Sequence, residues 1–530
     1  MTYWARPPES REQAVLFPQR LDEALPREHV VRLLDEVLGR LDWSRFEACY
    51  HGRIGQPPIH PRVLAGVLLY GLGTRLRSSR ALEEALQVRL DFRWLAEGQT
   101  IDHCILSEFR RRHSEELKEL FVQVCVVARE LGLVSLDLLG FDGTRVRANN
   151  RRRATRTAKE LQQALAELRT RFEEFQQQAD AEDARDEERF GLRKPRELPA
   201  ELRDAPQRLQ KLDAALQRLK EAGRDADGTP QRIPLTDPQS RVMPNKEGGH
   251  APNYTPTATV DLGSGLIVGA DVLSVINEDG HLLPACEEVQ TQFALPTPPP
   301  VAADGLMATG ANIAGCEARG ILLYSPVPVP DPASNPALRA DPSQPVAEKD
   351  WDRLPTHRVK IHGQTQPQLD KTAFVYDAAR NCYWCPLGHA LSYRTTTSQA
   401  HGRGRRVRAR YQAARQSCQA CPLRARCLGG QAKARQVHRD QYDAHRERHA
   451  LHMARPESQT QYARRRHAGE RPFAVIKQQF GLRQFLLRGL RAVQDEWRWA
   501  VTAFNLLRIH SLLRSRAGPN DSLPSLVPYP

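Results

Sequence analysis

Three acidic residues lie where a short apolar run or a predicted helix adjoins a turn. Asp142 follows LLGF and precedes Gly-Thr, and Asp304 lies in VAADG, also before a glycine. Glu470 lies in RRRHAGERPFAVIKQQFG, at or near the start of a predicted helix. Carboxylates from separate elements can converge on two divalent cations about 3.5–4 Å apart, the arrangement for metal-assisted cleavage of a phosphodiester. Magnesium prefers such oxygen ligands and keeps waters that a substrate phosphate can replace.

Other aspartates have comparable surroundings. A single Asp-Gly pair is most often simply a turn, so it is weak evidence for a metal ligand. The competing candidates are Asp137, Asp261 and Asp279. Residue types and spacing alone therefore leave the carboxylate set open.

The ten cysteines are unevenly distributed, and half of them crowd into one segment. These five form two Cys-x-x-Cys pairs with one cysteine to spare: Cys382, Cys385, Cys418, Cys421 and Cys427. Two such pairs in a cytosolic segment predict a structural, tetrahedral zinc site with the four paired thiolates as ligands. Cys427 is an alternative to one of the four, and His389 is a weaker candidate. Four sulfur ligands leave no open position, so this zinc would not be catalytic.

The segment between the two cysteine pairs is basic. Its sequence, TTTSQAHGRGRRVRARYQ, predicts a β-hairpin. Arginines in and beside it would offer a phosphate-contacting surface, the alternative being a solvated basic loop. They are Arg403, Arg405, Arg406, Arg408, Arg410, Arg424 and Arg426.

A mixed α/β core must position these groups. Strands are predicted in LVSLDLLGFDGTRVRANN, in ILLYSPVPVP, and on both sides of the turn Gly263-Ser264-Gly265. Helices are predicted in HLLPACEEVQTQF and ANIAGCEARG, and over most of 440–515. Strands interleaved with helices indicate an α/β fold class. The proline-rich stretch 330–370 predicts a loop or linker.

Two apolar stripes at helical spacing lie between the first predicted strand and the rest of this core. The first comprises Leu161, Leu165, Leu168, Phe172 and Phe175, and the second Leu202, Leu209, Leu212, Leu216 and Leu219. Two such stripes predict a helical hairpin whose apolar seams face each other.

The charge balance indicates a polyanionic partner. The chain has 77 Lys+Arg against 63 Asp+Glu, a formal charge of +14 and a pI near 9.5. Such a surplus favours nucleic acid or an anionic membrane, and charge alone does not separate them. The amino terminus lacks the pattern of a secretory signal, and the longest apolar run, Val63–Leu72, is too short to span a bilayer. We therefore expect a soluble, cytosolic protein.

Three blocks of the sequence resemble a known family. FDGTRVRANN, VAADGLMATGANIAGCEARGI and YARRRHAGERPFAVIKQQFGLRQFLLRGL are similar to the signature blocks of acidic-triad (DDE) insertion-sequence transposases. PRVLAGVLLYGL, SSRALEEAL and SEFRRRH resemble the helical amino-terminal domain of the branch that also has a cysteine-rich insertion. The resemblance implies a ribonuclease-H-like core. It also implies a cytoplasmic, bacterial protein that associates with the nucleoid when it acts.

Residue by residue, the resemblance places the catalytic, metal-binding triad on Asp142, Asp304 and Glu470. It implies two Mg²⁺ or Mn²⁺ ions. The last block also matches a signature with an arginine before the glutamate and a lysine after it, which fall on Arg466 and Lys477.

Four basic residues of these blocks are candidate DNA contacts: Arg145, Arg147, Arg466 and Lys477. On one continuous helix, Arg466 and Lys477 would share a face with Glu470. If the helix instead starts at Pro472, Arg466 approaches from a loop.

The implied activity is DNA transposition. The protein would cut the terminal inverted repeats of its element and transfer the strands to target DNA, as a homodimer on paired ends. The alternatives are a decayed or repurposed DNA-binding protein of transposase origin, and a metal-dependent nuclease that hydrolyses DNA without joining it.

Six segments make up the expected domain organisation. They are a helical amino-terminal DNA-binding domain (1–130), the first part of the ribonuclease-H-like core (131–155), an inserted helical hairpin (156–235), the second part of the core (236–345), the cysteine-rich insertion (346–440) and the carboxy-terminal helical part of the core (441–520). In the first segment, Ser78 or Ser79 is predicted to cap a helix. Its short helices form either a helix-turn-helix or an ordinary bundle.

Overall fold

The computed structural model divides the chain into two compact units. It describes residues 20–52, 57–150, 155–190, 204–222, 232–245, 248–328, 331, 333–361, 364–401, 404–429 and 431–517. Unit 1 contains the described residues of Met1–Pro299 and Arg464–Pro530, and unit 2 those of Pro300–Ala463. Arg403, Leu202 and parts of the predicted hairpin and termini (1–19, 191–203, 223–231, 518–520) lie outside the described residues.

Unit 1 begins with helices, as the sequence predicts. They are α1 (Val30–Gly39), α2 (Ser44–Ala48), α3 (Pro61–Gly73), α4 (Ser79–Val88), α5 (Leu90–Leu95), α6 (His103–Arg112) and α7 (Ser114–Glu130). Ser78 caps α4, because its side chain accepts a hydrogen bond from the Ala81 amide. Helix α3 is apolar on nearly every side, and it is correspondingly buried along almost its whole length.

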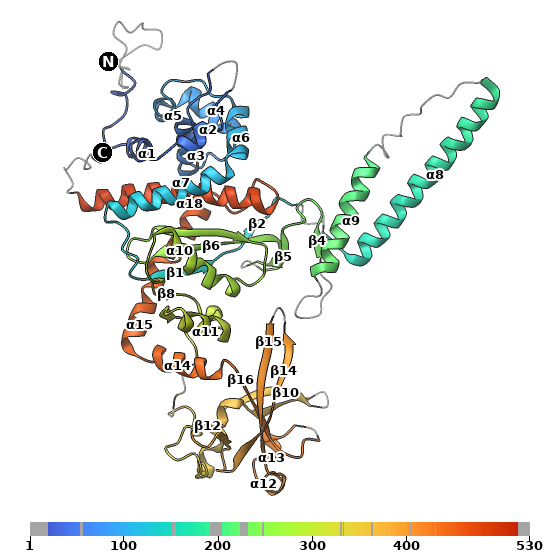
Figure 1. The fold of residues 1–530 in the computed structure, drawn as a ribbon, viewed down its shortest axis with the longest axis vertical. Coiled ribbons are helices and arrows are strands. Elements are labelled where there is room, and N and C mark those ends of the chain that lie inside the picture. The colour runs from blue at the N-terminus through green and yellow to red at the C-terminus, as the bar shows by residue number, and fades with distance from the viewer. Residues whose placement is uncertain are drawn as a thin grey trace, which may run out of the picture. The chain divides into compact units, whose positions relative to one another are not determined.

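The last helix, α18 (Leu490–Arg516), packs against α1, α3, α7 and strand β7. Figure 1 shows α7 and α18 side by side. The predicted helical stretch before it is divided rather than continuous. Gly481 and Gly489 have positive φ angles of 70° and 86°, which separate α18 from the short helix α17 (Arg471–Gln478).

The sheet of unit 1 is built around one long strand, β6 (His250–Asp261), which is buried at every position except its first. Strands β1 (Leu139–Gly143) and β7 (Ile267–Leu273) both pair antiparallel with β6. Two short strands, β2 (Val146–Arg147) and β5 (Arg241–Pro244), pair with its first half. Helix α10 (Leu282–Gln292) follows a 3-10 turn at Asp279–His281 and packs on β7.

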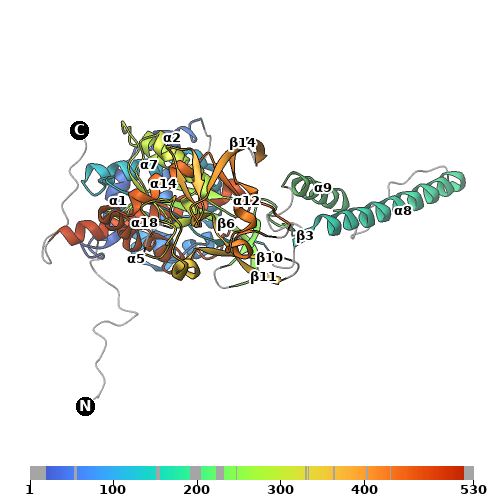
Figure 2. The same cartoon turned by 90° about the horizontal axis from the view of Figure 1, so that it is seen from below.

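The predicted helical hairpin is present in the described residues. Helices α8 (Ala158–Phe190) and α9 (Ala205–Ala222) lie side by side in Figures 1 and 2, next to a small sheet of β3 (Thr155–Thr157) and β4 (Arg232–Pro234). The leucine seams meet as the spacing predicts. Their buried contacts include Leu161, Leu165, Leu216, Leu219 and Ile233.

Unit 2 begins with two short parallel strands, β8 (Val301–Ala302) and β9 (Leu323–Tyr324). Between them are a 3-10 turn (Gly305–Met307) and α11 (Gly310–Ala318). Helix α11 packs on α14 (Asp443–Met453), and α15 (Pro456–Ala463) packs on β9.

The rest of unit 2 is the cysteine-rich insertion. Strands β12 (Val375–Asp377), β13 (Cys382–Trp384), β14 (Ala390–His401), β15 (Gly404–Ala413) and β16 (Gln436–Asp440) form an antiparallel sheet in that order. The predicted β-hairpin between the cysteine pairs is confirmed as β14–β15. Helices α12 (Arg415–Gln419) and α13 (Arg424–Cys427) follow it, and 3-10 turns lie at Glu348–Arg353 and Lys371–Ala373.

The prediction of a loop over 330–370 is wrong for the second half of that range. Strands β10 (Thr356–Ile361) and β11 (Gln364–Leu369) form a hairpin there. Val359 and Ile361 are the only apolar residues of THRVKI, so the apolar alternation is too short to reveal the strand.

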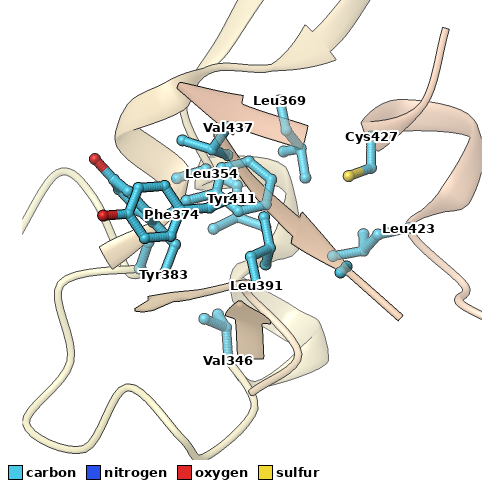
Figure 3. Packing of buried hydrophobic residues seen from close by; sticks show 13 residues of the cluster. Val346, Leu354, Leu369, Phe374, Tyr383, Leu391, Tyr411, Leu423, Cys427 and Val437 are labelled. Carbon is cyan, nitrogen blue, oxygen red and sulfur yellow. The ribbon is translucent and has the colours of Figure 1, made fainter. Parts of the chain in front are cut away.

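The insertion has its own apolar core, shown in Figure 3. Tyr383 and Tyr411 approach each other edge to face at 5.1 Å, a geometry that stabilises aromatic pairs. Leu391, Leu423 and Cys427 are buried in the same cluster. The insertion is therefore a packed module rather than a solvated loop.

Among the described residues, no helix combines the length and apolarity needed to cross a membrane.

Glycine 310 tests the contact of α11 with α14. A Cβ at Gly310 would overlap the Cβ of Tyr442, so we expect Gly310→Ala to destabilise the protein by about 1–3 kcal/mol through overpacking. Thermal or urea unfolding of the full chain measures the loss. In the control Gly280→Ala the added Cβ meets nothing within 4 Å, and the unfolding midpoint should stay close to wild type. Equal midpoints for both variants would show that this close packing is absent.

Candidate active site

Asp142 lies in β1, directly after the buried residues Leu139 and Phe141. Its Oδ1 accepts a hydrogen bond from the Gly143 amide at 2.9 Å. Its Oδ2 lies 3.0 Å from Nη2 of Arg465, and the two side chains are only 18% and 12% exposed. A carboxylate near the end of a buried strand, largely shielded from water, is thus held against one cation.

The last sequence block joins this strand end from a separate part of the chain. Arg465 begins the short helix α16 (Arg465–Ala468), and Glu470 is the N-cap of α17. Lys477 in α17 donates hydrogen bonds to Thr144 Oγ1 and to the Arg145 carbonyl at 2.8 Å. Helix α17 is therefore fixed against the turn that follows Asp142.

The break between α16 and α17 decides how Arg466 relates to Glu470. Pro472 lies in the first turn of α17, as proline prefers, so no continuous helix runs from Arg466 to Lys477. Glu470 and Arg466 are both exposed. Arg465 contacts Asp142, and sequence reasoning missed this contact because the signature spacing pointed to its neighbour Arg466.

Arg145 and Arg147 lie just beyond Asp142, at β2. The Arg145 guanidinium donates hydrogen bonds to Thr255 Oγ1 and the Ile276 carbonyl, and it lies 3.8 Å from Glu278. Burial lowers the pKa of Arg145, while Glu278 opposes that shift. Arg147 is half-buried, and its backbone hydrogen-bonds Arg483 and Phe485. Both residues thus help hold the turn, and Arg145 directs its charge into the protein.

Asp304 belongs to unit 2, two residues after β8. It is half-buried, and its side chain accepts a hydrogen bond from the Leu306 amide at 2.9 Å. Its carbonyl accepts a hydrogen bond from Ser325 Oγ at 2.5 Å. His449 of α14 in turn contacts the Ser325 carbonyl through Nε2 at 2.8 Å. The backbone that carries Asp304 is thereby tied to β9 and α14.

The competing aspartates have different surroundings. Asp261 is fully buried, and it accepts hydrogen bonds from the Leu136 amide and from both the amide and hydroxyl of Ser264. These bonds stabilise the β6–β7 turn and occupy the carboxylate. Asp137 is exposed before β1, and Asp279 begins a 3-10 turn. Among the candidates, Asp261 therefore has a structural role.

The cysteines of the insertion form a group that differs by one member from the two predicted pairs. A cavity of about 30 Å³ is lined by Cys385, Cys418, Cys421 and Cys427, with His389 beside them. Cys382 does not line it, because Cys382 lies in β13 opposite Ser392 of β14. The structure thus groups Cys427, rather than Cys382, with the other three.

Each of two cysteines in this group begins a Cys-Pro-Leu sequence, at Cys385 and at Cys421. The His389 amide donates a hydrogen bond to Cys385 Sγ at 3.3 Å. The amides of Leu387 and Leu423 lower the pKa of Cys385 and Cys421, respectively. This repeat is the sequence signal that would have identified Cys385 and Cys421 as equivalent. Amide donors to sulfur favour the thiolate form that binds metal.

Burial of the cysteines opposes that ionisation. It raises the pKa of Cys385 and of Cys421, and it raises the pKa of Cys427 to about 12. Neighbouring thiols of the group raise the pKa of Cys427 further, because adjacent thiolates repel each other. A bound cation would remove both penalties. Among the described residues, however, no three ligand atoms of this group lie within 4.8 Å of one another, so a metal would have to draw the sulfurs together.

A second group of potential ligands lies in the amino-terminal helices. Ligand atoms of Cys49, His113 and Glu116 lie within 4.8 Å of one another. His113 is buried among aromatic rings, and its Nε2 lies 3.1 Å from the Tyr50 hydroxyl. This arrangement is that of a hydrogen-bonded core histidine.

Two stretches of the chain match known protein families. Residues 384–510 match the model of a family described as Transposase DDE domain. Residues 19–112 match that of a family described as Transposase domain (DUF772). These two matches support an insertion-sequence DDE transposase. No curated protein matches it.

The matched ranges include some of the candidate residues and exclude others. Glu470, Lys477 and four of the clustered cysteines lie within 384–510, whereas Cys382 lies just before that range. Asp142 and Asp304 also precede it. Their assignment therefore rests on the resemblance of their own sequence blocks and on their positions at strand ends.

His449 provides a pH-dependent test of the contacts that hold Asp304. Burial lowers the pKa of His449 below its usual value. Because the unfolded chain binds the proton more readily, His449 contributes stability above about pH 6.5 that is lost as pH falls. We expect the unfolding temperature to fall between pH 7.5 and 5, and to fall less in His449→Gln. An identical fall in both proteins would contradict the proposed role of His449, since His438, His452 and His510 would account for all of it.

Proposed function

We propose that this transposase cuts DNA at the ends of its element and joins the resulting 3′-hydroxyls to target DNA. In this proposal Asp142, Asp304 and Glu470 hold two Mg²⁺ or Mn²⁺ ions. The observation that carries it is the junction of the first and last blocks in unit 1. Lys477 bonds the turn after Asp142, and Arg465 contacts Asp142 itself. Residues more than 300 positions apart thus converge, as a multi-element carboxylate site requires.

We further infer that β1, β6, β7, β8 and β9 belong to a ribonuclease-H-like core. The support is the antiparallel β1–β6–β7 pairing in unit 1 and the parallel β8–β9 pairing in unit 2. Asp142 lies near the end of β1, and Asp304 follows β8 after one buried residue. The last block precedes the long helix α18, which packs on β7.

The protein's own residues have distinct tasks in this reaction. Asp142, Asp304 and Glu470 would hold the metal ions, which would supply activation of the attacking oxygen and stabilisation of the leaving oxygen. Lys477 positions α17, because its ammonium is bonded to the protein. Arg466, with an exposed side chain on α16, is available to a DNA phosphate. Arg465 compensates the charge of Asp142.

A cleavage and strand-transfer assay tests the function. DNA that carries both ends of the element is incubated with protein and Mg²⁺ or Mn²⁺. Wild-type protein should cut and join. Asp142→Asn, Asp304→Asn and Glu470→Gln should each bind the DNA but lose about a hundredfold or more in cleavage rate, because each metal stabilises the transition state by several kcal/mol. Asp137→Asn, which alters an exposed aspartate five residues before Asp142, is the matched control and should retain activity.

Each other outcome has a definite meaning. Full activity of Asp304→Asn would overturn the assignment of the second carboxylate. Cutting without joining would identify a metal-dependent nuclease. Wild-type protein that binds the element ends but neither cuts nor joins them would identify a repurposed DNA-binding protein.

We also propose that the insertion holds one structural zinc ion through Cys385, Cys418, Cys421 and Cys427. Its support is the shared cavity and the two Cys-Pro-Leu turns with amides directed at sulfur. A four-thiolate zinc would fix α12 and α13, which are only five and four residues long, against the apolar core. Isolated helices of this length do not persist in water, so the site supplies their stability.

Zinc content separates the two possible ligand sets. The purified full chain should contain about one zinc ion, as a single four-thiolate site requires. Cys427→Ser should lose most of it, whereas Cys382→Ser should retain it, because Cys382 does not line the cavity. The reverse pattern would restore the two-pair ligand set. Folded wild-type protein without zinc would exclude the site altogether.

A further inference from the structure

A basic pocket of about 470 Å³ lies in unit 2, where β15 and β16 meet the start of α14. Its lining shares no residue with the cysteine cavity and includes none of Asp142, Asp304 and Glu470. Its charged lining consists of four cations and two carboxylates: Lys371, Arg406, Arg408, Arg446, Asp440 and Asp443. The pocket therefore carries an excess of two positive charges.

The two carboxylates hold three of the cations in place. Arg446 Nη2 lies 2.6 Å from Asp440 and 2.7 Å from Asp443. Lys371 Nζ lies 2.7 Å from Asp443, and Arg406 Nη2 lies 3.1 Å from Asp440. The carboxylate side chains are 8% and 11% exposed, whereas the cations are 36–43% exposed. The buried carboxylates thus hold the cations in place, and the cations remain partly exposed, so an anion can contact them.

Arg408 is the cation of the pocket that has no carboxylate partner among the described residues. The positive charge of Arg408 nevertheless acts on His438, which also lines the pocket. Burial lowers the pKa of His438, and Arg408, Arg410 and Lys371 lower it further. The field in the pocket is thus strongly positive, and its histidine adds no charge at neutral pH.

The cations follow the repeat of a β-strand. Arg406, Arg408 and Arg410 lie at alternate positions of β15, so they share one face, and Arg405 lies on the other. Alternate residues of a strand are about 6.7 Å apart, close to the separation of successive phosphates along a DNA strand. A row at this spacing fits a chain of phosphates better than one small anion.

We propose that this pocket binds the sugar–phosphate backbone of DNA, with Arg408 as the principal unpaired contact. The proposal rests on the proposed function for its substrate, because a transposase must hold DNA beyond the bonds that it cuts. Contacts to phosphate position a protein on the duplex and carry no sequence information. The pocket should therefore serve element ends and target DNA alike.

Salt-dependent binding of a duplex of unrelated sequence tests this pocket. The full chain carries Glu470→Gln, so that DNA remains uncut, and is compared with the same chain that also carries Arg408→Gln. We expect Arg408→Gln to weaken binding by about fivefold or more near physiological salt. It should also reduce the slope of log K against log salt by about 1, the contribution of one phosphate contact.

The matched control is Arg405→Gln. Although Arg405 is one of the arginines that the sequence groups as phosphate contacts, it does not line the pocket. The substitution removes the same charge from the same strand on the opposite face, where, among the described residues, the Arg405 side chain bonds Ser398 Oγ. The control should leave the slope unchanged. Equal effects of the two substitutions, or none from Arg408→Gln, would overturn the proposal. A third outcome would also overturn the proposal. If the protein binds inorganic phosphate saturably, and Arg408→Gln abolishes that binding without changing DNA affinity, the site binds a small anion rather than DNA.

Binding and cleavage fail separately. If Arg408→Gln leaves DNA affinity and its salt dependence unchanged while the chain without Glu470→Gln cleaves DNA, only the proposed DNA contact of the pocket is disproved. Conversely, if wild-type protein does not cut DNA but Arg408→Gln weakens DNA binding as expected, the proposed DNA contact stands and the proposed enzyme activity is disproved. Unfolding temperature and zinc content of Arg408→Gln, measured in parallel, should equal those of the control variant.

Discussion

The packing of α18 beneath the sheet is the constraint on which unit 1 depends. Asn505 in this helix bonds both the amide and the carbonyl of Ile267, at 2.9 and 2.7 Å, and Trp497 donates to the Thr257 carbonyl at 3.1 Å. These backbone groups lie in buried strands, where an unpaired polar group would cost about 1–3 kcal/mol. The carboxy-terminal helix therefore completes a core that the first half of the chain begins.

The placement of the last sequence block follows from that constraint. Since α18 is fixed against β7 and the amino-terminal helices, α17 just before it must return toward the sheet. Phe473 of α17 stacks on Trp497 of α18 at 6.1 Å, and Lys477 bonds the turn after β1. Apolar packing on one side and polar contacts on the other thus orient the segment that carries Glu470.

Charge compensation recurs in each candidate site. Arg465 faces Asp142, buried aspartates support the cations of the basic pocket, and amides point at the sulfurs of the cysteine group. Each arrangement lowers the cost of burying charges of one sign close together. Sites built this way can keep their geometry before a metal ion or phosphate arrives, which reduces the ordering cost of binding.

Local patterns in the sequence determined much of this protein. Alternation and turn residues identified β1, β6, β7 and the β14–β15 hairpin, and helical spacing identified α8 and α9, because each signal depends only on near neighbours. Capping chemistry limited the cap of α4 to Ser78 or Ser79, and the structure shows that Ser78 is the cap. The signature blocks identified the family, which the matches at 384–510 and 19–112 support.

Only the tertiary structure decided between residues that the sequence leaves equivalent. Arg465 and Arg466 are adjacent arginines of α16, and the structure places Arg465 against Asp142 and leaves Arg466 exposed. Cys382 and Cys427 are both spaced to complete a zinc site, and the pairing of β13 with β14 removes Cys382 from the cavity. In sequence, Asp261 resembles a catalytic aspartate. In the structure it is buried and accepts a hydrogen bond from Ser264 in the β6–β7 turn. These choices depend on contacts between distant segments, which no local pattern encodes.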